Sequence, residues 1–298
     1  MAETITTSST LFPAELVNDV FSKVKGHSTL ARLAAQTPIP FAGTQEFVFS
    51  MDGEAAIVGE GAAKPAGNAK FEPVTIKPIK FIYQHRLTDE FIKMSEEKQI
   101  PYLQAFTDGF AKKIARALDI AAFHGVNPAD GAASEIVGTN NFDNKITTTI
   151  AYDEAAVDEN LDDAISKLQI ADADITGIAF SNVAAAAMGK IKASGTGTYL
   201  YPEFRFGGKP ASFGGNSCDV NNTLTFGSSL DRIIAGDFAN AFKWGYAEDV
   251  PMEIIQYGDP DGQGDLKRNN QIVLRTEAYI GWGILDAASF ALIKAANG

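Results

Sequence analysis

The first apolar pattern in the chain predicts a short helix near the N-terminus. Residues 1–12 are polar and rich in Ser and Thr, Pro13 opens the helical pattern, and Gly26 closes it. Its apolar positions share one stripe and are Leu16, Val17, Val20, Phe21 and Val24. A helix of about three turns is marginal in isolation, so we expect this stripe to pack on another part of the chain or on another copy.

The next pattern predicts a long projecting hairpin. Residues 44–50 alternate like a strand, with Phe47 and Phe49 on one face, and residues 74–88 alternate in the same way. Residues 51–73 between them hold four glycines and two prolines and show almost no periodic pattern of apolar residues. Such a segment cannot form a core of its own, and a loop of that length is usually functional or disordered.

The strongest helical pattern covers residues 100–124. Apolar residues recur there at three- and four-residue steps, and Gly125 and Pro128 end the pattern. A helix of that length spans roughly 36 Å, which is long for a globular domain. The pattern therefore predicts a structural spine.

The second half of the chain alternates helices and strands and predicts an α/β part. A loop rich in Gly, Asn and Thr at 126–150 precedes it. Asp153 can cap the first helix, a strand follows at 175–180, and Ser181 can cap the second helix. Further strands are expected at 223–226, 232–235, 242–244, 252–257 and 271–280.

Composition narrows the class of protein. The 298 residues are 45% hydrophobic and include 20 Phe, which supply enough apolar surface for a folded core. The net charge of −12 repels phosphate, which disfavours sequence-specific nucleic-acid binding. Cys218 is the only cysteine, so an internal disulfide framework is excluded. No apolar run is long enough to cross a bilayer and the polar start lacks a signal-peptide pattern, so we expect an intracellular product without a membrane partner.

Residues suited to catalysis or metal binding are sparse. The histidines, His27, His85 and His124, have no metal-binding spacing, and His124 suits the C-terminal end of the long helix because of the helix dipole. Cys218 has no basic neighbour in the sequence that would activate it. No nucleophile elbow, phosphate-binding loop or dinucleotide motif occurs. The sequence predicts no catalytic residue, no metal site and no cofactor.

One acidic loop has part of a calcium-binding pattern. Asp259, Asp261 and Asp265 take positions one, three and seven of an EF-hand-like loop, but Gln263 and Asn270 occupy two positions that need carboxylates. An acidic hairpin turn is the better interpretation.

Five stretches occur in an order that is similar to one protein family. They are Pro13–Leu16; Ala56–Gly61 with Lys64; Leu87–Phe91 before the long helix; Ile233–Phe238 with Trp244; and Asn270–Arg275 continuing to Phe290. Each stretch alone is a weak signal. Their order over nearly the whole chain resembles the major capsid protein of tailed bacteriophages, the Hong Kong 97 fold.

The resemblance implies an α+β, Hong Kong 97-like capsid fold in four parts. These are an N-terminal arm (1–43), an extended β-hairpin loop (44–78), a peripheral domain with the long spine helix (79–150 and 246–285), and an α/β axial domain (151–245 and 286–298). The implied function is that of a structural subunit, not an enzyme, which self-assembles into the icosahedral head shell enclosing the DNA genome of a tailed bacteriophage. The expected location is the virion, after assembly in the host cytoplasm.

The resemblance also implies partners. These are other copies of the chain in pentamers and hexamers, a portal, decoration proteins as an option, and packaged double-stranded DNA contacted without sequence specificity. Assembly is expected to use a separate scaffolding protein, or none, because the short helix begins within a dozen residues of Met1. The expected inter-subunit contact residues are Leu16, Val20 and Phe21 in the arm, and Glu54, Glu60, Lys64 and Lys70 in the hairpin.

Alternatives stay open on the sequence alone. An encapsulin-type nanocompartment shell shares the fold and would enclose a protein cargo instead of a genome, whereas an α/β hydrolase or a calcium-stabilised adhesin belongs to another class. The namesake of the fold crosslinks its shell through Lys–Asn isopeptide bonds. Here Lys64 or Lys70 with Asn269 or Asn270 are the available pairs, and we expect non-covalent closure.

Overall fold

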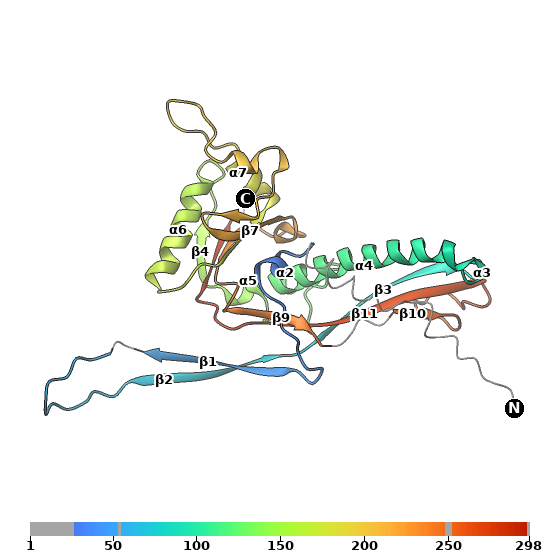
Figure 1. The fold of residues 1–298 in the computed structure, drawn as a ribbon, viewed down its shortest axis with the longest axis horizontal. Coiled ribbons are helices and arrows are strands. Elements are labelled where there is room, and N and C mark those ends of the chain that lie inside the picture. The colour runs from blue at the N-terminus through green and yellow to red at the C-terminus, as the bar shows by residue number, and fades with distance from the viewer. Residues whose placement is uncertain (1–26, 53–54, 248–251, 297–298) are drawn as a thin grey trace.

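The structure is a computed structural model that describes residues 27–52, 55–247 and 252–296. A six-stranded sheet with its helices stands on an elongated platform, which is made of one long helix and a four-stranded sheet (Figure 1). A two-stranded hairpin projects from the junction, away from the far end of the long helix (Figure 1).

The six-stranded sheet organises the upper part of the molecule. Its strands, in spatial order, are β4 (Thr148–Ala151), β12 (Phe290–Lys294), β8 (Asp231–Gly236), β5 (Gly177–Ser181), β7 (Asn216–Asn221) and β6 (Ser212–Phe213). β12 is parallel to β4 and β5 is parallel to β7, while the other pairs are antiparallel. All five residues of β5 are buried, as expected for a strand covered on both faces of its sheet.

Helices α6 (Val157–Ile170) and α7 (Asn182–Met188) cover one face of this sheet. Leu161 and Leu168 of α6 are buried there in one cluster with Ile178 of β5. The next strand residue, Ala179, belongs to a different core on the opposite face, since successive strand residues point to opposite sides. Ser181 caps α7 as predicted, because its hydroxyl accepts the backbone N–H of Ala184 at 3.1 Å.

The platform consists of α4 (Glu96–His124) lying along an antiparallel sheet (Figure 1). The strands of this sheet are β3 (Ile79–Thr88), β9 (Phe242–Tyr246), β10 (Met252–Ile255) and β11 (Gln271–Ile284), and β11 pairs with each of the others. Phe110 and Leu118 of α4 are buried in the same core as Trp282 of β11. Gly125 ends α4 in the left-handed conformation, with φ 68, as the sequence predicts.

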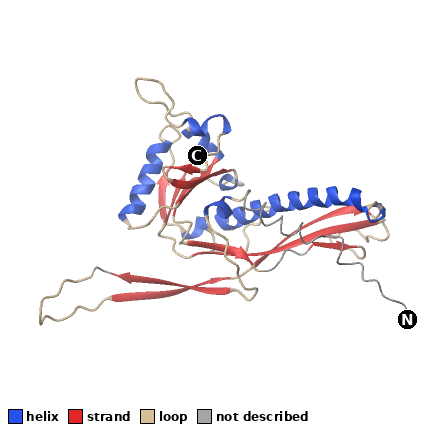
Figure 2. Cartoon of the chain, in the orientation of Figure 1, coloured by secondary structure: helices blue, strands red, loops and turns tan. Residues whose placement is uncertain are grey.

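β1 (Thr44–Asp52) and β2 (Asn68–Ile76) form the projecting antiparallel hairpin. Its base is anchored on the platform, because Ile76 is buried and lies against Gly283 of β11. The ammonium of Lys243 also donates to Glu46 Oε1 at 2.6 Å. Figure 2 shows that no described helix packs along the hairpin, so its outer part has no cover within the described chain.

The remaining described elements are short helices. They are α2 (Thr29–Leu33), α3 (Glu90–Lys93), α5 (Phe142–Lys145) and the 3-10 helices η1 (Pro202–Gly207) and η2 (Thr223–Thr225).

Some predicted boundaries are wrong for a clear physical reason. The long helix begins at Glu96 instead of residue 100, because its first residues are polar and extend no apolar stripe. β2 begins at Asn68, inside the segment predicted to be irregular, because the side chains at the start of this strand that are described are exposed and show no buried period. The strand predicted for 74–88 is interrupted at Lys77 and Pro78, since proline has no N–H for a sheet ladder.

Turn chemistry accounts for further differences in the second half. Residues 223–226 were predicted as a strand, but the side chain of Asn221 accepts the N–H of Thr223 and the segment forms η2. Asp153 does not cap α6; its carboxylate accepts the N–H of Ala155, before the helix begins. The helix after Ser181 ends at Met188 instead of near residue 193.

Gly245 of β9 gives a test of this packing. A Cβ at this position would overlap the carbonyl oxygen of Thr37. Thr37 lies beside β9 and donates its N–H to the carbonyl oxygen of Trp244. We expect Gly245→Ala to lower the free energy of unfolding by roughly 1–3 kcal/mol, as overpacking does. Urea denaturation of the unassembled subunit measures the change.

Gly109 is the matched control for that variant. It lies in the interior of α4 on an exposed position, and a Cβ there would meet no atom within 4 Å. Gly109→Ala should raise the free energy of unfolding by about 0.5–1 kcal/mol, because alanine is the better helix former. Equal effects of the two substitutions would contradict the close approach of Thr37 to β9.

Candidate functional site

The hairpin presents an exposed aromatic face. Phe47, Phe49 and Phe71 are 56%, 58% and 61% exposed. The β1–β2 register places Phe49 directly opposite Phe71, so all three side chains share one side of the hairpin. The rings of Phe47 and Phe71 stack with their centroids 4.8 Å apart. Adjacent exposed phenylalanines are typical of an interaction surface.

The loop at the end of the hairpin adds further exposed groups. Ile57 and Val58 are exposed apolar residues, and Glu60 and Lys64 are exposed charges on the same loop. Lys70 is exposed on β2. Among the described residues, none of these three predicted charges has an ion-pair partner within 4.0 Å.

The structure describes none of the other predicted contact residues. Leu16, Val20, Phe21 and Glu54 lie outside the described residues. The sequence pattern placed Phe47 and Phe49 together but missed Phe71, because the beginning of β2 was not predicted. Phe71 could have been predicted from its position opposite residues 44–50, a predicted strand with two phenylalanines on one face.

The N-terminal end of the described chain is fixed to the long helix by Asp119, a residue that the sequence analysis missed. Asp119 is fully buried on α4, where its Oδ1 accepts the Ser28 hydroxyl at 2.5 Å and its Oδ2 accepts the backbone N–H of Thr29 at 2.9 Å. Burial raises the pKa of Asp119 to about 7, although these hydrogen bonds act in the opposite direction. Asp219 of β7 adds a second anchor by accepting from the Thr29 hydroxyl and from Arg32. The position at which residues 1–26 join the body is therefore set by buried hydrogen bonds.

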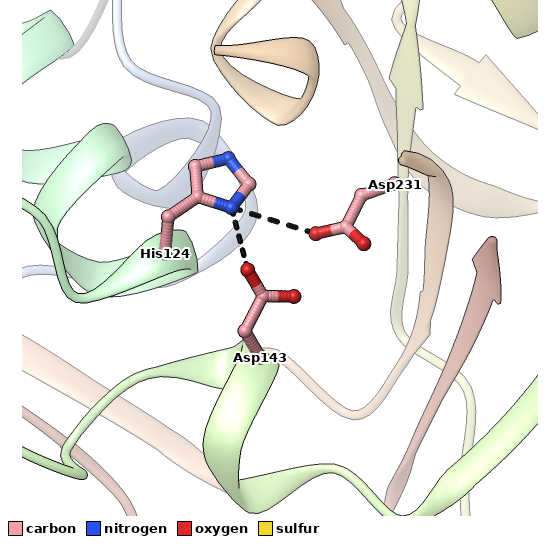
Figure 3. A group of neighbouring side chains, drawn as sticks. All are labelled: His124, Asp143 and Asp231. Atoms are coloured by element: carbon pink, nitrogen blue, oxygen red, sulfur yellow. Dashed lines mark hydrogen bonds and ion pairs between the residues drawn. The ribbon is translucent and has the colours of Figure 1, made fainter. Parts of the chain in front are cut away.

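A cluster of charged side chains joins four elements of the fold, and Figure 3 draws three of its members, His124, Asp143 and Asp231. His124 comes from the end of α4, Asp143 from α5, Asp231 from β8 and Lys294 from β12. His124 Nδ1 lies 2.8 Å from an Asp143 carboxylate oxygen and 3.5 Å from Asp231 Oδ2. Lys294 Nζ lies 2.8 Å from Asp143 and 3.3 Å from Asp231. The cluster holds the C-terminal end of the spine helix to β8 and β12, which are adjacent strands of the six-stranded sheet.

The hydrogen bonds of His124 define its charge. Its Nε2 lies 2.9 Å from the carbonyl oxygen of Thr223, which can only accept, so Nε2 carries a proton. Its Nδ1 faces the carboxylate of Asp143 and must donate as well, so the ring is an imidazolium. Two cations, His124 and Lys294, then balance two carboxylates.

The pKa shifts follow from this arrangement. Burial lowers the pKa of His124, but the hydrogen bond to Asp143 and the charge of that carboxylate outweigh it and raise the pKa above its ordinary value. Burial and the neighbouring charge of Asp143 raise the pKa of Asp231 to about 7. For Asp143 burial acts upward, but the hydrogen bonds from His124 and Lys294 hold its pKa well below the usual range.

Within the part of the chain that the structure describes, His124, Asp143 and Asp231 form the one group of three potential metal ligands, with ligand atoms within 4.8 Å of one another. The 2.8 Å separation of His124 Nδ1 from Asp143 is the length of an N–H···O hydrogen bond. Because the ammonium of Lys294 and the imidazolium of His124 both face Asp143 and Asp231, the geometry fits an ion-pair cluster better than a metal centre.

The acidic loop after β10 is folded around an arginine. The guanidinium of Arg86 on β3 contacts Asp261, lies 3.2 Å from Asp259 and donates to the carbonyl oxygen of Gly264 at 2.8 Å. Its hydrogen bonds lower the pKa of Asp261 to about 2. A cation of the protein thus takes the place that calcium would need, and the interpretation as an acidic turn is the better one.

Comparison with known proteins assigns the family. Residues 9–295 match the phage capsid family, so the chain belongs to that family. A solved structure from Mycobacterium phage Ogopogo is 30% identical, with a TM-score of 0.78 over 91% of this chain and 92% of that one. A structure from Gordonia phage Cozz is 24% identical, with a TM-score of 0.74 over 91% of this chain and 87% of that one.

A more distant relative has the same fold. The capsid of an empty GTA particle is 17% identical, with a TM-score of 0.64 over 100% of this chain and 95% of that one. No curated protein is significantly similar in sequence. The fold is the Hong Kong 97 fold that the sequence predicted, and the chain is a subunit of a capsid shell, a structural protein and not an enzyme. None of the described helices is long and apolar enough to span a membrane.

The cluster around His124 predicts a specific pH dependence. A histidine with a raised pKa stabilises the fold fully below its unfolded pKa, about 6.5, and this stabilisation is lost as the pH rises through the folded pKa. Asp231 acts in the same direction, because its carboxyl becomes charged as the pH passes about 7. Asp143, with its lowered pKa, keeps its contribution down to strongly acidic pH. We expect the subunit to unfold more easily at pH 9 than at pH 6.

His124→Gln should weaken that pH dependence, because the contribution of the imidazolium is lost while the contributions of Asp231 and Asp119 remain. At pH 6 it should lower the free energy of unfolding by roughly 1–3 kcal/mol, because the buried carboxylate of Asp143 then loses one of its two cationic partners. His85→Gln, at an exposed position of β3, is the control and should leave the pH profile unchanged. Urea unfolding at both pH values measures this, and an unaltered profile in the His124 variant would rule out the imidazolium.

Proposed function

We propose that this chain is the major capsid protein of a tailed bacteriophage, and that its copies close as pentamers and hexamers into an icosahedral head around double-stranded DNA. The observation that supports this most directly is the projecting hairpin, whose aromatic face has no cover among the described residues. A closed shell of identical subunits supplies such cover from a neighbour.

The physical argument starts from the hairpin itself. An isolated two-stranded hairpin is marginally stable in water. Among the hairpin side chains that the structure describes, only Ile76 at the base is buried, and the face with Phe47, Phe49 and Phe71 is open. Full burial of a phenylalanine contributes roughly 1.5–3 kcal/mol, so the three rings are a substantial driving force for each subunit contact. The hairpin of one subunit would therefore lie over the next.

The N-terminal arm would make a second contact of this kind. Its apolar stripe, with Leu16, Val20 and Phe21, has the pattern of a helix that needs a partner surface. Asp119 and Asp219 hold the point from which this arm departs. We extend the proposal to the four-part division into arm (1–43), extended loop, peripheral domain and axial domain.

Further partners belong to the same proposal. A head of this kind would use a separate scaffolding protein, a portal and, as an option, decoration proteins, and it would assemble in the host cytoplasm. The net charge of −12 disfavours tight binding to phosphates, which suits a lining that must let DNA enter and leave. Glu60, Lys64 and Lys70 would form non-covalent contacts with neighbours.

Removing the aromatic face tests the proposal. The double variant Phe47→Ser with Phe71→Ser should stay folded, because both rings are exposed, and should reduce assembled shells by about tenfold or more. Circular dichroism checks the fold, and sedimentation with negative-stain microscopy counts shells.

Tyr257→Ser is the matched control, since it removes an aromatic ring that is 69% exposed but lies away from the hairpin. Normal shells from the double phenylalanine variant would refute the role of the hairpin. Wild-type particles that enclose a protein cargo and exclude DNA would instead favour a nanocompartment shell.

A further inference from the structure

The outer side of α6 is a row of unpaired acidic residues. Glu159, Asp162 and Asp163 are exposed on one helical face, while Leu161 and Leu168 bind the sheet on the other. None of the three has an ion-pair partner within 4.0 Å among the described residues. Like charges at three- and four-residue spacing repel one another on a helix, and a cationic partner surface would relieve that repulsion.

A basic patch lies elsewhere on the surface. It consists of Arg32 of α2, Lys112 and Arg116 of α4, and Lys209 in the loop after η1, and it lines a hollow of about 280 Å³. Arg32 is paired with Asp219 at 2.7 Å. Lys112 and Lys209 are exposed and have no ion-pair partner within the described part of the chain. In a chain of net charge −12, such a concentration of cations is a distinct feature.

The two surfaces lie at opposite ends of the six-stranded sheet. α6 packs on β4 and β12 at one end, whereas α2 packs on β7 toward the other end. In Figure 1, α6 lies toward the end of the molecule to which the hairpin projects, whereas α2 lies near the middle, beside α4. A neighbour that the hairpin covers would therefore also face α6.

We propose that the acidic face of α6 in one subunit docks on the basic patch of the next subunit around a ring. This inference rests on the proposed function, because it specifies how subunits of a pentamer or hexamer meet. The contact joins two different surfaces, so it is heterologous and repeats head to tail until the ring closes. Opposite charges then select the correct neighbour, since a wrong pairing would place like charges together.

Charge reversal on each side tests the contact. The basic-side variant is Lys112→Glu with Lys209→Glu, and the acidic-side variant is Asp162→Lys with Asp163→Lys; all four side chains are exposed. Each variant alone should reduce shells by about tenfold or more at low salt. The four substitutions combined in one chain should restore assembly, because the opposite charges meet again.

Mixing the two variants gives a sharper result. The basic-side variant then carries two acidic surfaces, and the acidic-side variant carries two basic surfaces. In a ring where the two variants alternate, every contact therefore joins an acidic surface to a basic one. Such alternation closes with six subunits but not with five, so the mixture should form hexamers and fail to form pentamers. Native mass spectrometry of capsomers and microscopy of the products separate the two ring sizes.

Controls and outcomes distinguish this inference from the proposed function. Lys93→Glu with Lys98→Glu makes the same charge change near the far end of the platform and should leave assembly as in the wild type. Normal assembly of the reversed variants, or no rescue by the combined one, overturns the charge-matched contact. Normal shells that retain less DNA in the basic-side variant would also overturn it and mark a nucleic-acid surface. Failure of the wild type itself to form closed shells would instead refute the proposed function.

Discussion

The apolar stripe of α4 is the contact on which both large sheets depend. Phe110 and Leu118 are buried in one continuous core with Trp282 of the platform and Ile234 of the upper sheet. A close-packed core transmits strain, so neither sheet can shift along α4 without repacking the other. The long helix therefore turns two sheets into one body. The hairpin lies outside this core, and Ile76 at its base is the one buried side chain among those described for it.

The charged groups fall into two sets: buried groups that have partners within the fold, and exposed groups that have no ion-pair partner among the described residues. Inside, the carboxylates of Asp119 and Asp143 have donors from several elements, so they fix how those elements meet. Outside, Asp162 and Lys112 lie at exposed positions without ion-pair partners among the described residues. Buried ion pairs need such close partners because desolvation is costly, whereas exposed charges remain available to a second molecule.

The sequence predicted features whose cause is local in the chain. The left-handed end of α4 at Gly125 and the cap of α7 by Ser181 depend on the residue itself and on its near neighbours. The prediction at Thr223 was wrong, because a side-chain turn at Asn221 decided the conformation. The start of β2 was missed because an exposed strand has no buried period to detect.

Hydrophobic periodicity predicted the spine helix and the projecting hairpin, while the family was implied by the resemblance of five stretches in order and is shown by the match over residues 9–295. Only the tertiary structure decided which distant residues meet. His124 and Lys294 are 170 positions apart in the sequence and share the carboxylate of Asp143, while Arg86 fills the acidic loop around Asp261. Such pairings depend on how sheets and helices are placed in three dimensions, and no local pattern contains that information.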